Sequence, residues 1–299
     1  MSGPLEFDTI IVGAGSAGCL LANRLSAQRG QRILLVEAGG EDDWFWIKIP
    51  VGYLFTIANP RTDWCFKTQP EPGLAGRSVH YARGRGLGGS SSINAMIYMR
   101  GQSYDFDQWA QLTGDERWRW NGENGQTLSI YKALENYFGG ANDWHGETGE
   151  IRVETPRVKW KILDAWQQAA AQQGIPSIDE FNRGNNEGCA YFHVNQRRGR
   201  RWSMADAFLH PVRHRENLSV FTNTQTLQVL FEENRERRPS DQSAWANATL
   251  RARGVRLLKD GQIIEARARK EVILSAGAIG SPHILQASGI GDPKHLAEF

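Results

Sequence analysis

The chain has 299 residues, of which 40% are hydrophobic and 23% charged, and its formal net charge is +2. This composition is typical of a globular protein that buries a sizeable core, in one large domain or two ordinary ones. The charge is too small to indicate a nucleic-acid partner, and no apolar run approaches the length of a transmembrane helix.

The N-terminal residues and the cysteines indicate the cellular setting. Met1–Pro4 lead almost directly into an apolar run, without the basic and apolar segments of a signal peptide. We therefore expect a cytoplasmic protein, with peripheral contact at the inner membrane left open. Cys19, Cys65 and Cys189 form no C-x-x-C pair, so we expect neither a disulfide framework nor a metal site.

Residues 7–37 have the order of elements that is typical of a nucleotide-binding βαβ unit. The apolar run at 9–12 predicts a buried parallel strand. The periodic segment 16–26 predicts a helix, and the apolar run 33–36 predicts a second strand.

Three glycines and one acid give this unit its chemistry. Gly13, Gly15 and Gly18 follow the G-x-G-x-x-G spacing, which allows a tight turn, close approach of a pyrophosphate and close packing of helix on strand. The helix N-terminus would offer free N–H groups to the phosphates. Glu37 ends the second strand, where it could accept hydrogen bonds from an adenosine ribose and would repel a 2′-phosphate. The spacing alone does not separate FAD from NAD, and a βαβ unit without a ligand is the alternative.

A second glycine-rich stretch, RGRGLGGSSSINAM, occupies residues 83–96. Its small residues permit close approach of a ligand, and its serines are typical helix caps. We expect a helix that starts near Ile93 and whose positive end, with Arg83 or Arg85, faces an anionic or electron-rich group. A flexible loop is the alternative.

The remaining segments predict more of the same sheet. Residues 115–150 are expected to be irregular and residues 160–173 helical. Residues 218–231 alternate apolar and polar side chains, as strands do. The charged segment 232–253 predicts an exposed hairpin or insertion. The buried run 271–275 ends in small residues, which favours a third parallel strand that returns to the nucleotide site at the carboxyl edge of the sheet.

Together these segments closely resemble the glucose-methanol-choline (GMC) oxidoreductases, which are FAD-dependent alcohol oxidases and dehydrogenases. The resemblance spans residues 7–291 and is carried by the following segments: IIVGAGSAGCLLANRL, LLVEAGG, DWCFKTQPEP, ARGRGLGGSSSINAMIYMRG, GRRWSMADAFLHP and EVILSAGAIGSPHILQASGIG. The segments IYMRG, DFDQWA and QRRGRRWS resemble the branch of bacterial choline and aliphatic-alcohol dehydrogenases.

The resemblance implies an α/β fold: a Rossmann-like FAD-binding fold with a parallel sheet, plus part of a smaller substrate-binding region. It places a discontinuous FAD-binding domain at residues 5–155 and 204–299, and the start of the substrate-binding region at 156–203. The C-terminal half of the family fold is expected to lie beyond Phe299.

The resemblance also implies the cofactor and its site. FAD is expected to be non-covalent, because the glycine–serine stretch lacks the His through which some members attach it. The implied cofactor-binding residues are Gly13, Gly15, Ser16, Ala17, Gly18, Glu37, Ala38, Trp64, Arg83, Gly88, Gly89, Ser90, Asn94, Ala95, Met96, Thr226, Ala276 and Gly277. Thr226 stands where family members often have Val, a change that should not forbid binding.

The implied activity is oxidation of a primary alcohol, choline-like or aliphatic, to an aldehyde, with hydride transfer to flavin N5. Oxygen or a quinone-type carrier would be the electron acceptor. The catalytic His of the family is expected beyond Phe299, so no residue of this chain is assigned as catalytic or as a metal ligand. We expect the chain to be the N-terminal portion of a longer enzyme. A catalytically inactive FAD-binding fragment and a lyase of the same fold are the alternatives.

Overall fold

The computed structural model describes residues 5–233 and 250–298. Its contacts divide the chain into two compact units, which are treated separately below. The first unit comprises residues 1–47, 52–93 and 204–299, and the second comprises residues 48–51 and 94–203.

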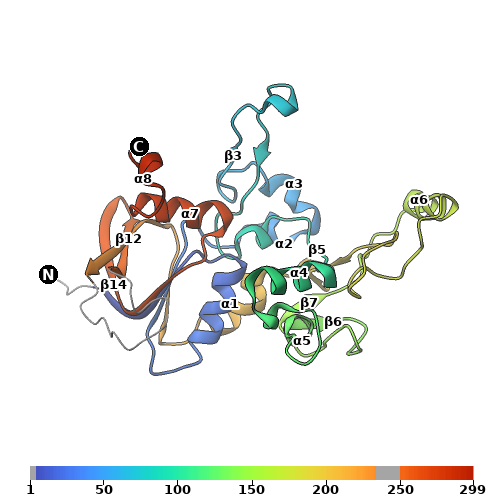
Figure 1. Ribbon diagram of the computed structural model, residues 1–299, viewed down its shortest axis with the longest axis horizontal. Coiled ribbons are helices and arrows are strands. Elements are labelled where there is room, and N and C mark those ends of the chain that lie inside the picture. The colour runs from blue at the N-terminus through green and yellow to red at the C-terminus, as the bar shows by residue number, and fades with distance from the viewer. Residues whose placement is uncertain (1–4, 234–249, 299) are drawn as a thin grey trace. The chain divides into compact units, whose positions relative to one another are not determined.

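The first unit is built around a single sheet (Figure 1). The strands of the first unit are β1 (Leu5–Val12), β2 (Ile33–Val36), β3 (Phe66–Lys67), β4 (His80–Tyr81), β11 (Leu218–Phe221), β12 (Thr224–Glu233), β13 (Leu250–Lys259) and β14 (Gln262–Leu274). Its α-helices are α1 (Ser16–Leu25), α2 (Phe45–Lys48), α3 (Tyr53–Thr56), α7 (Gly277–Ala287) and α8 (Pro293–Leu296). Short turns of other helix types occupy Pro72–Leu74, Gly89–Ser92, Ala205–Leu209 and His210–Val212, while most of the turn Pro50–Gly52 belongs to the second unit.

The main sheet has six strands in the order β11-β2-β1-β14-β13-β12 and is mixed. Strands β11, β2, β1 and β14 run parallel, while β13 and β12 extend the sheet antiparallel to their neighbours. The predicted third parallel strand is confirmed, because Thr9–Val12 pair with Glu271–Leu274. The α/β architecture with parallel strands therefore agrees with the sequence prediction.

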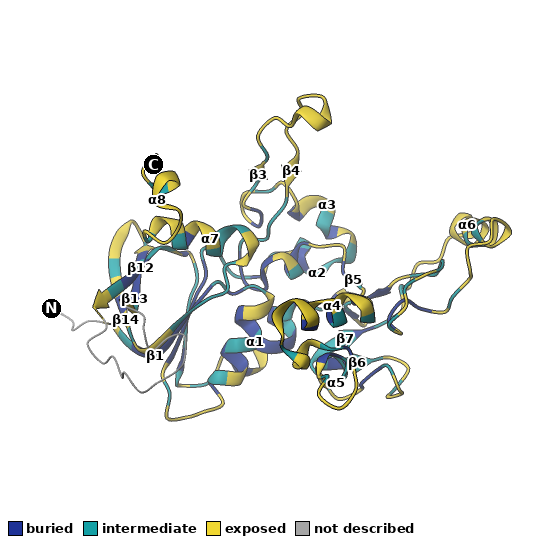
Figure 2. Cartoon of the chain, viewed as in Figure 1, coloured by how far each residue is buried: buried dark blue, intermediate teal, exposed yellow. Residues whose placement is uncertain are grey.

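Both faces of the parallel strands are covered, as continuous apolar runs require. Ile10 and Val12 on one face of β1 share a core with Val255 and Leu257 of β13 and with Ile284 of α7. The side chains that alternate with them are also buried, and α1 packs on β1 and β2. The parallel strands are accordingly dark blue in Figure 2. This packing fixes the carboxyl ends of β1, β2 and β14 at one edge of the sheet.

The second unit has short strands and three longer helices. Its strands are β5 (Ile97–Tyr98), β6 (Glu135–Tyr137), β7 (Ile151–Val153), β8 (His193–Val194), β9 (Gln196–Arg197) and β10 (Arg200–Arg201). Its helices are α4 (Ser103–Thr113), the short turn Glu116–Trp118, α5 (Thr127–Leu134) and α6 (Lys161–Gln172). The helix predicted at 160–173 is confirmed as α6, which buries none of its residues and is mostly yellow in Figure 2.

Two expectations for secondary structure are wrong. The segment 115–150 is not irregular throughout, because α5 and β6 lie within it. No α-helix starts near Ile93: Gly89–Ser92 form a short 3₁₀ turn, and Ile93 ends it. Met96 has a φ of 62°, which a right-handed helix does not contain, and strand β5 begins at Ile97, so the chain does not continue into a helix here.

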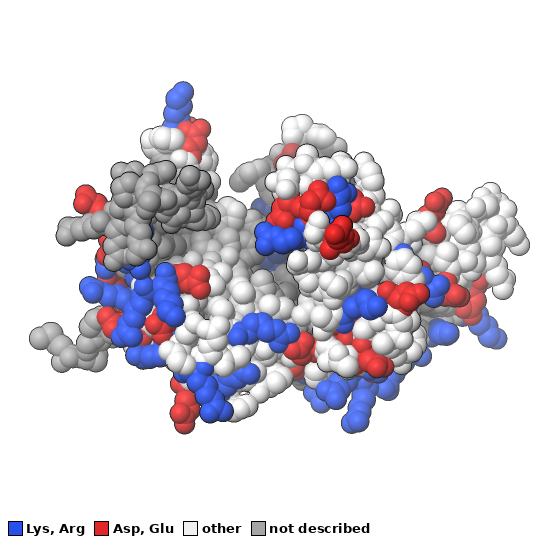
Figure 3. All heavy atoms as spheres, turned by 60° about the horizontal axis from the view of Figure 1, so that its bottom comes forward, with Lys and Arg blue, Asp and Glu red and all other residues white. Residues whose placement is uncertain are grey.

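The charged segment predicted as an insertion falls largely outside the described residues. Its flanks continue the sheet, since β12 reaches Glu233 and β13 starts at Leu250. Among the described residues no helix is long and apolar enough to cross a membrane. Acidic and basic side chains are interspersed on the face drawn in Figure 3. The predicted domain boundaries stay a prediction; residues 94–155, assigned there to the FAD-binding domain, belong to the second compact unit.

Candidate functional site

A cavity of about 710 Å³ lies in the first unit at the carboxyl ends of the parallel strands. Val12, Val36 and Leu274, which end β1, β2 and β14, all line it. Ligands of open α/β sheets bind at this edge, because the strand ends leave a crevice there. The predicted site residues that line the cavity are Gly13, Gly15, Ser16, Ala17, Glu37, Ala38, Trp64, Arg83, Gly89, Ser90, Thr226, Ala276 and Gly277.

The first and third glycines of the motif are required by the fold itself. Gly13 has a φ of +96°, and a Cβ there would lie 2.6 Å from the Ser275 carbonyl oxygen. A Cβ on Gly18 would lie 1.9 Å from the carbonyl oxygen of Gly13. Gly18 does not line the cavity, and its role is to let α1 pack on the turn.

Gly15 is different, because nothing in the chain requires a glycine there. Its backbone has φ −73° and ψ −163°, which any residue adopts. A Cβ would meet nothing within 4 Å. Gly15 lines the cavity, so a side chain would project into open space. The missing side chain therefore leaves room for a ligand.

The N-terminus of α1 opens at the same place. The first intrahelical bond runs from the Cys19 N–H to the Gly15 carbonyl, 2.9 Å away, and no side chain caps the helix. The N–H groups of the first turn thus have no intrahelical acceptor. With the positive end of the helix dipole they form a site for phosphate oxygens.

Glu37 is buried beside the glycine turn and lines the cavity. Its Oε2 accepts a hydrogen bond from the N–H of Ala14 at 2.8 Å, and its Oε1 accepts from Gly39 at 2.9 Å and Gly86 at 3.0 Å. Burial raises the pKa of Glu37, although these three backbone N–H groups act to lower it. Oε2 accepts a single one of these bonds, so the carboxylate keeps capacity to accept more.

The second glycine-rich stretch packs directly on the first. The N–H of Gly88 donates to the Ala14 carbonyl at 2.8 Å, and a Cβ on Gly89 would lie 2.8 Å from the Cα of Gly15. Gly88 does not line the cavity, whereas Gly89 and Ser90 do. The stretch closes the cavity as a turn, so the predicted helix dipole near Ile93 does not act here.

Aromatic and basic side chains form another part of the cavity wall. Trp64 and Phe66 both line it, and their rings stack with centroids 5.7 Å apart and planes 3° apart. Arg83 also lines it and donates to the Tyr81 hydroxyl at 2.7 Å and the Ala82 carbonyl at 2.8 Å. Arg85 is not part of the wall; it donates to the Pro60 and Ala38 carbonyls at 3.4 and 3.5 Å.

The remaining predicted residues fall into two groups. Thr226 of the edge strand β12 lines the cavity, and its buried hydroxyl has no hydrogen-bond partner among the described residues. Asn94, Ala95 and Met96 belong to the second unit. There Asn94 Oδ1 accepts from the Met96 N–H at 3.0 Å and from Arg201 Nη1 at 2.8 Å. The part of these three residues in cofactor binding stays a prediction.

Phe66 and His283 are among the side chains of the cavity wall that sequence reasoning missed. Phe66 lies two residues after Trp64, and this spacing in a strand-like segment could have indicated it. His283 lies on α7.

The second unit contains a buried cluster of charged side chains. His145 has its Nδ1 2.9 Å from Glu135 Oε2 and its Nε2 2.7 Å from Glu180 Oε2. Both ring nitrogens face carboxylate oxygens. Only the protonated imidazole can donate a hydrogen bond from each of its two nitrogens. Burial would lower the pKa of His145, but the hydrogen bonds to the two glutamates outweigh it and raise the pKa. Arg100 completes the cluster, with Nη2 2.8 Å from Glu135 Oε2.

Comparison with known proteins assigns the chain to a family. The family model described as GMC oxidoreductase matches residues 7–298. An oxygen-dependent choline dehydrogenase of Pseudomonas putida is 40% identical over 299 residues, which cover 98% of this chain and 49% of that protein. The crystal structure of pyridoxine 4-oxidase from Mesorbium loti is similar with a TM-score of 0.87 at 34% identity, covering 97% of this chain and 53% of that one. An FAD-dependent oxidoreductase from Chaetomium thermophilum has a TM-score of 0.83 at 26% identity and covers 98% and 49%. The chain thus spans about half the length of the curated relatives it matches.

Proposed function

Because the chain belongs to the GMC oxidoreductase family, we propose that its first unit binds FAD in the cavity at the carboxyl ends of β1, β2 and β14. One structurally similar protein is described as an FAD-dependent oxidoreductase. The proposal rests above all on Gly15, where the chain leaves out a side chain that its own fold would accommodate.

The residues around the cavity fit the parts of FAD. The uncapped N–H groups at the start of α1 suit the pyrophosphate. Glu37, with acceptor capacity remaining on Oε2, suits the ribose hydroxyls of adenosine. The stacked pair Trp64 and Phe66 offers an apolar ring surface, and Arg83 adds a positive charge that is fixed by its bonds to Tyr81 and Ala82.

The binding is proposed to be non-covalent. The glycine–serine stretch at residues 88–96 contains no histidine, which is the attachment residue of some family members. Mild acid should therefore release free FAD from the protein. Yellow colour that remains with the acid precipitate would contradict this.

We propose further that the complete protein oxidises a primary alcohol to an aldehyde. When bound, FAD supplies the hydride acceptor for such a reaction. The residues of this chain bind and orient the cofactor, while no residue of the chain is assigned as the base. The similarity to a choline dehydrogenase supports a choline-like or aliphatic alcohol as substrate. Oxygen and a quinone-type carrier are the proposed electron acceptors, and the cytoplasm or the inner membrane surface is the proposed location.

A direct experiment tests the cofactor proposal on the chain as it stands. The purified chain is incubated with FAD, free FAD is removed by gel filtration, and the visible spectrum is recorded. We expect flavin absorption that corresponds to about one FAD per chain. A folded chain, with native circular dichroism but without flavin bands, would show that these residues do not hold FAD by themselves.

A further inference from the structure

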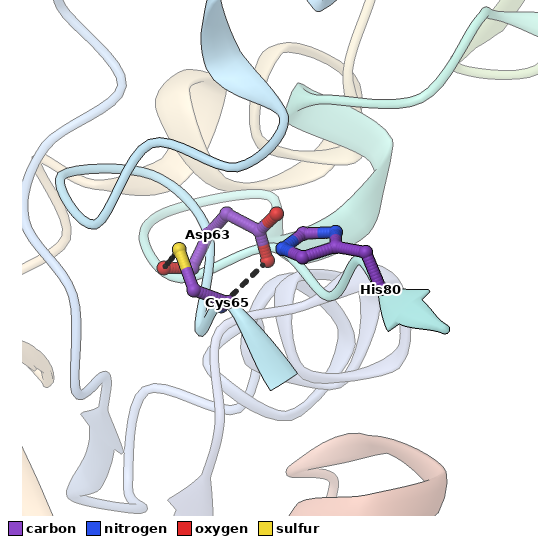
Figure 4. A group of neighbouring side chains, drawn as sticks. All are labelled: Asp63, Cys65 and His80. Atoms are coloured by element: carbon purple, nitrogen blue, oxygen red, sulfur yellow. Dashed lines mark hydrogen bonds between the residues drawn. The ribbon is translucent and has the colours of Figure 1, made fainter. Parts of the chain in front are cut away.

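A separate group of chemically active side chains lies in the first unit. Asp63, Cys65 and His80 each offer one ligand atom, and these atoms lie within 4.8 Å of one another. Figure 4 shows the imidazole of His80 directed at the carboxylate of Asp63 from one side, while the sulfur of Cys65 lies on the other side, next to the backbone carbonyl of Asp63. Asp63 is buried, Cys65 is half-buried and His80 is exposed, so the group is open to solvent on one side.

The pairing of two chain segments brings the three residues together. Phe66 and Lys67 pair antiparallel with Tyr81 and His80, and the bridge between Asp63 and Gly84 continues the same register. Cys65 has a φ of 55°, so the chain turns sharply between Asp63 and the strand. The fourteen residues between Cys65 and His80 hide this arrangement from any local sequence motif.

We propose that Asp63, Cys65 and His80 bind a zinc ion, although the sequence, lacking a C-x-x-C pair, led us to expect no metal site. A thiolate, an imidazole and a carboxylate are the ligands that zinc takes in proteins. Three protein ligands leave a fourth position for water, in keeping with the exposed side of the group. The sulfur and nitrogen ligands disfavour magnesium and calcium, which prefer oxygen.

The hydrogen bonds of Asp63 hold its carboxylate ready as a ligand. Oδ1 accepts from the N–H groups of Cys65 and Arg83, both at 3.0 Å, and Oδ2 accepts from Ala58 at 2.8 Å. Oδ2 therefore keeps a lone pair for the metal, and its position is set by the backbone before any ion binds. Such outer contacts fix the orientation of metal ligands generally.

Binding of a zinc ion would replace the thiol proton of Cys65: the S–H bond breaks, a sulfur–metal bond forms, and the proton passes to solvent.

Cobalt(II) is the probe of choice, because it takes zinc sites and its bond to a thiolate gives charge-transfer absorption in the near ultraviolet. Titration of the reduced full chain with Co²⁺ should give this absorption with an end point of one ion per chain, and Zn²⁺ should abolish it by displacement. Cys65→Ser should remove the charge-transfer band. His80→Ala should weaken binding more than roughly 100-fold, beyond the loss typical of an outer-shell change.

Matched controls separate this site from unspecific binding. Cys189→Ser removes another partly exposed thiol, and His214→Ala removes another exposed imidazole; both variants should bind Co²⁺ as the parent chain does. Asp63→Asn is avoided, because the carboxylate holds three backbone N–H groups and its change could disturb the fold. The proposal is overturned if the parent chain shows no charge-transfer band, if Cys65→Ser keeps it, or if Cys189→Ser loses it.

Discussion

Each unit buries a glutamate carboxylate, and the two carboxylates are satisfied in opposite ways. Among the described residues, Glu37 accepts hydrogen bonds from three backbone N–H groups and borders a cavity. Glu135 is fully buried, and its Oε2 faces the cations Arg100 and His145 and accepts from the Gly146 N–H. The backbone donors of Glu37 cancel part of the cost of burying its carboxylate while leaving one side open to a ligand. Glu135 has no such open side, because its side chain has no exposed surface. The comparison teaches that the partners of a buried charge, more than its burial, distinguish a binding site from a structural cluster.

The closed cluster should be the more costly of the two regions to disturb. Glu135→Ala leaves Arg100 and His145 without their shared carboxylate, and breaking a buried ion pair in this way costs about 3–5 kcal/mol. We expect that loss in the free energy of unfolding from urea denaturation. Glu265→Ala, which removes the partner of Arg256 in an exposed pair, is the control and should cost less than about 1 kcal/mol. Equal losses in the two variants would erase the distinction between the cluster and an ordinary surface pair.

The cluster should also give the stability of the chain a characteristic pH dependence. Burial would raise the pKa of Glu180, but hydrogen bonds from His145 and Arg183 lower it from 4.5 to about 2. Its stabilising contribution, about 3 kcal/mol, is complete above pH 4.5 and is lost as the pH falls toward about 2. The raised pKa of His145 acts oppositely: its contribution is complete below pH 6.5 and is lost as the pH rises through the raised value.

Urea unfolding between pH 3 and pH 9 should therefore show a maximum at mildly acidic pH. Glu180→Gln is the control, since it removes the carboxylate that titrates and keeps a hydrogen-bonding side chain of similar size. The variant should lose the acid limb of the profile. If parent and variant show the same slope between pH 4.5 and pH 3, other groups than Glu180 set the acid limb.

A substitution in the cavity of the first unit should change the affinity for FAD and hardly change the stability of the chain. Gly15→Val places a side chain in the cavity, where the backbone allows it and its Cβ meets no described atom within 4 Å. We expect FAD to bind at least about tenfold more weakly, roughly 1.4 kcal/mol, with an unchanged midpoint of urea unfolding in the absence of FAD. Titration by flavin fluorescence quenching measures the affinity.

Gly30→Val is the matched control for this variant. Gly30 is exposed, does not line the cavity, and a Cβ there also meets nothing within 4 Å. It should leave FAD affinity at the parent value. A Gly15→Val variant that binds FAD as tightly as Gly30→Val would remove the main support for the proposed cofactor site.

The parts of the fold and of the candidate site that could be predicted from the sequence are those formed by residues close to one another in the chain. The glycine turn, α1, both flanking strands and Glu37 lie within 33 consecutive residues, so spacing alone predicted them. The helix expected near Ile93 is absent because Met96 takes a left-handed angle and strand β5 begins at the next residue, which the serine caps do not reveal. α5 was missed although Leu128, Tyr131 and Leu134 have helical spacing, because neighbouring Trp, Asn and Gly residues dominate the composition.

Clusters that the fold assembles lay beyond sequence reasoning. Glu135, His145 and Glu180 meet across 45 residues of sequence, and Cys65 meets His80 through a strand pairing that no motif encodes. These residue types are common, and their irregular spacing matches no known motif, so the sequence does not indicate that they contact one another. In contrast, the turn Asp260-Gly261, with φ angles of 50° and 74°, has the standard sequence of a tight hairpin and could have located β13 and β14 precisely in register.

The smallest effect is expected at Thr226, the one predicted cofactor residue whose side chain ends in an unpaired buried hydroxyl among the described residues. A buried polar group without a partner costs free energy that an apolar group of the same shape does not. Thr226→Val should therefore raise the free energy of unfolding by about 1 kcal/mol without FAD. Affinity for FAD should stay within about twofold, because the hydroxyl oxygen is covered by protein atoms although Thr226 lines the cavity. If the variant instead binds FAD markedly more weakly, the hydroxyl turns to the cofactor on binding. Thr226 would then be, like Glu37, a polar residue of the cavity wall that forms a hydrogen bond with the ligand.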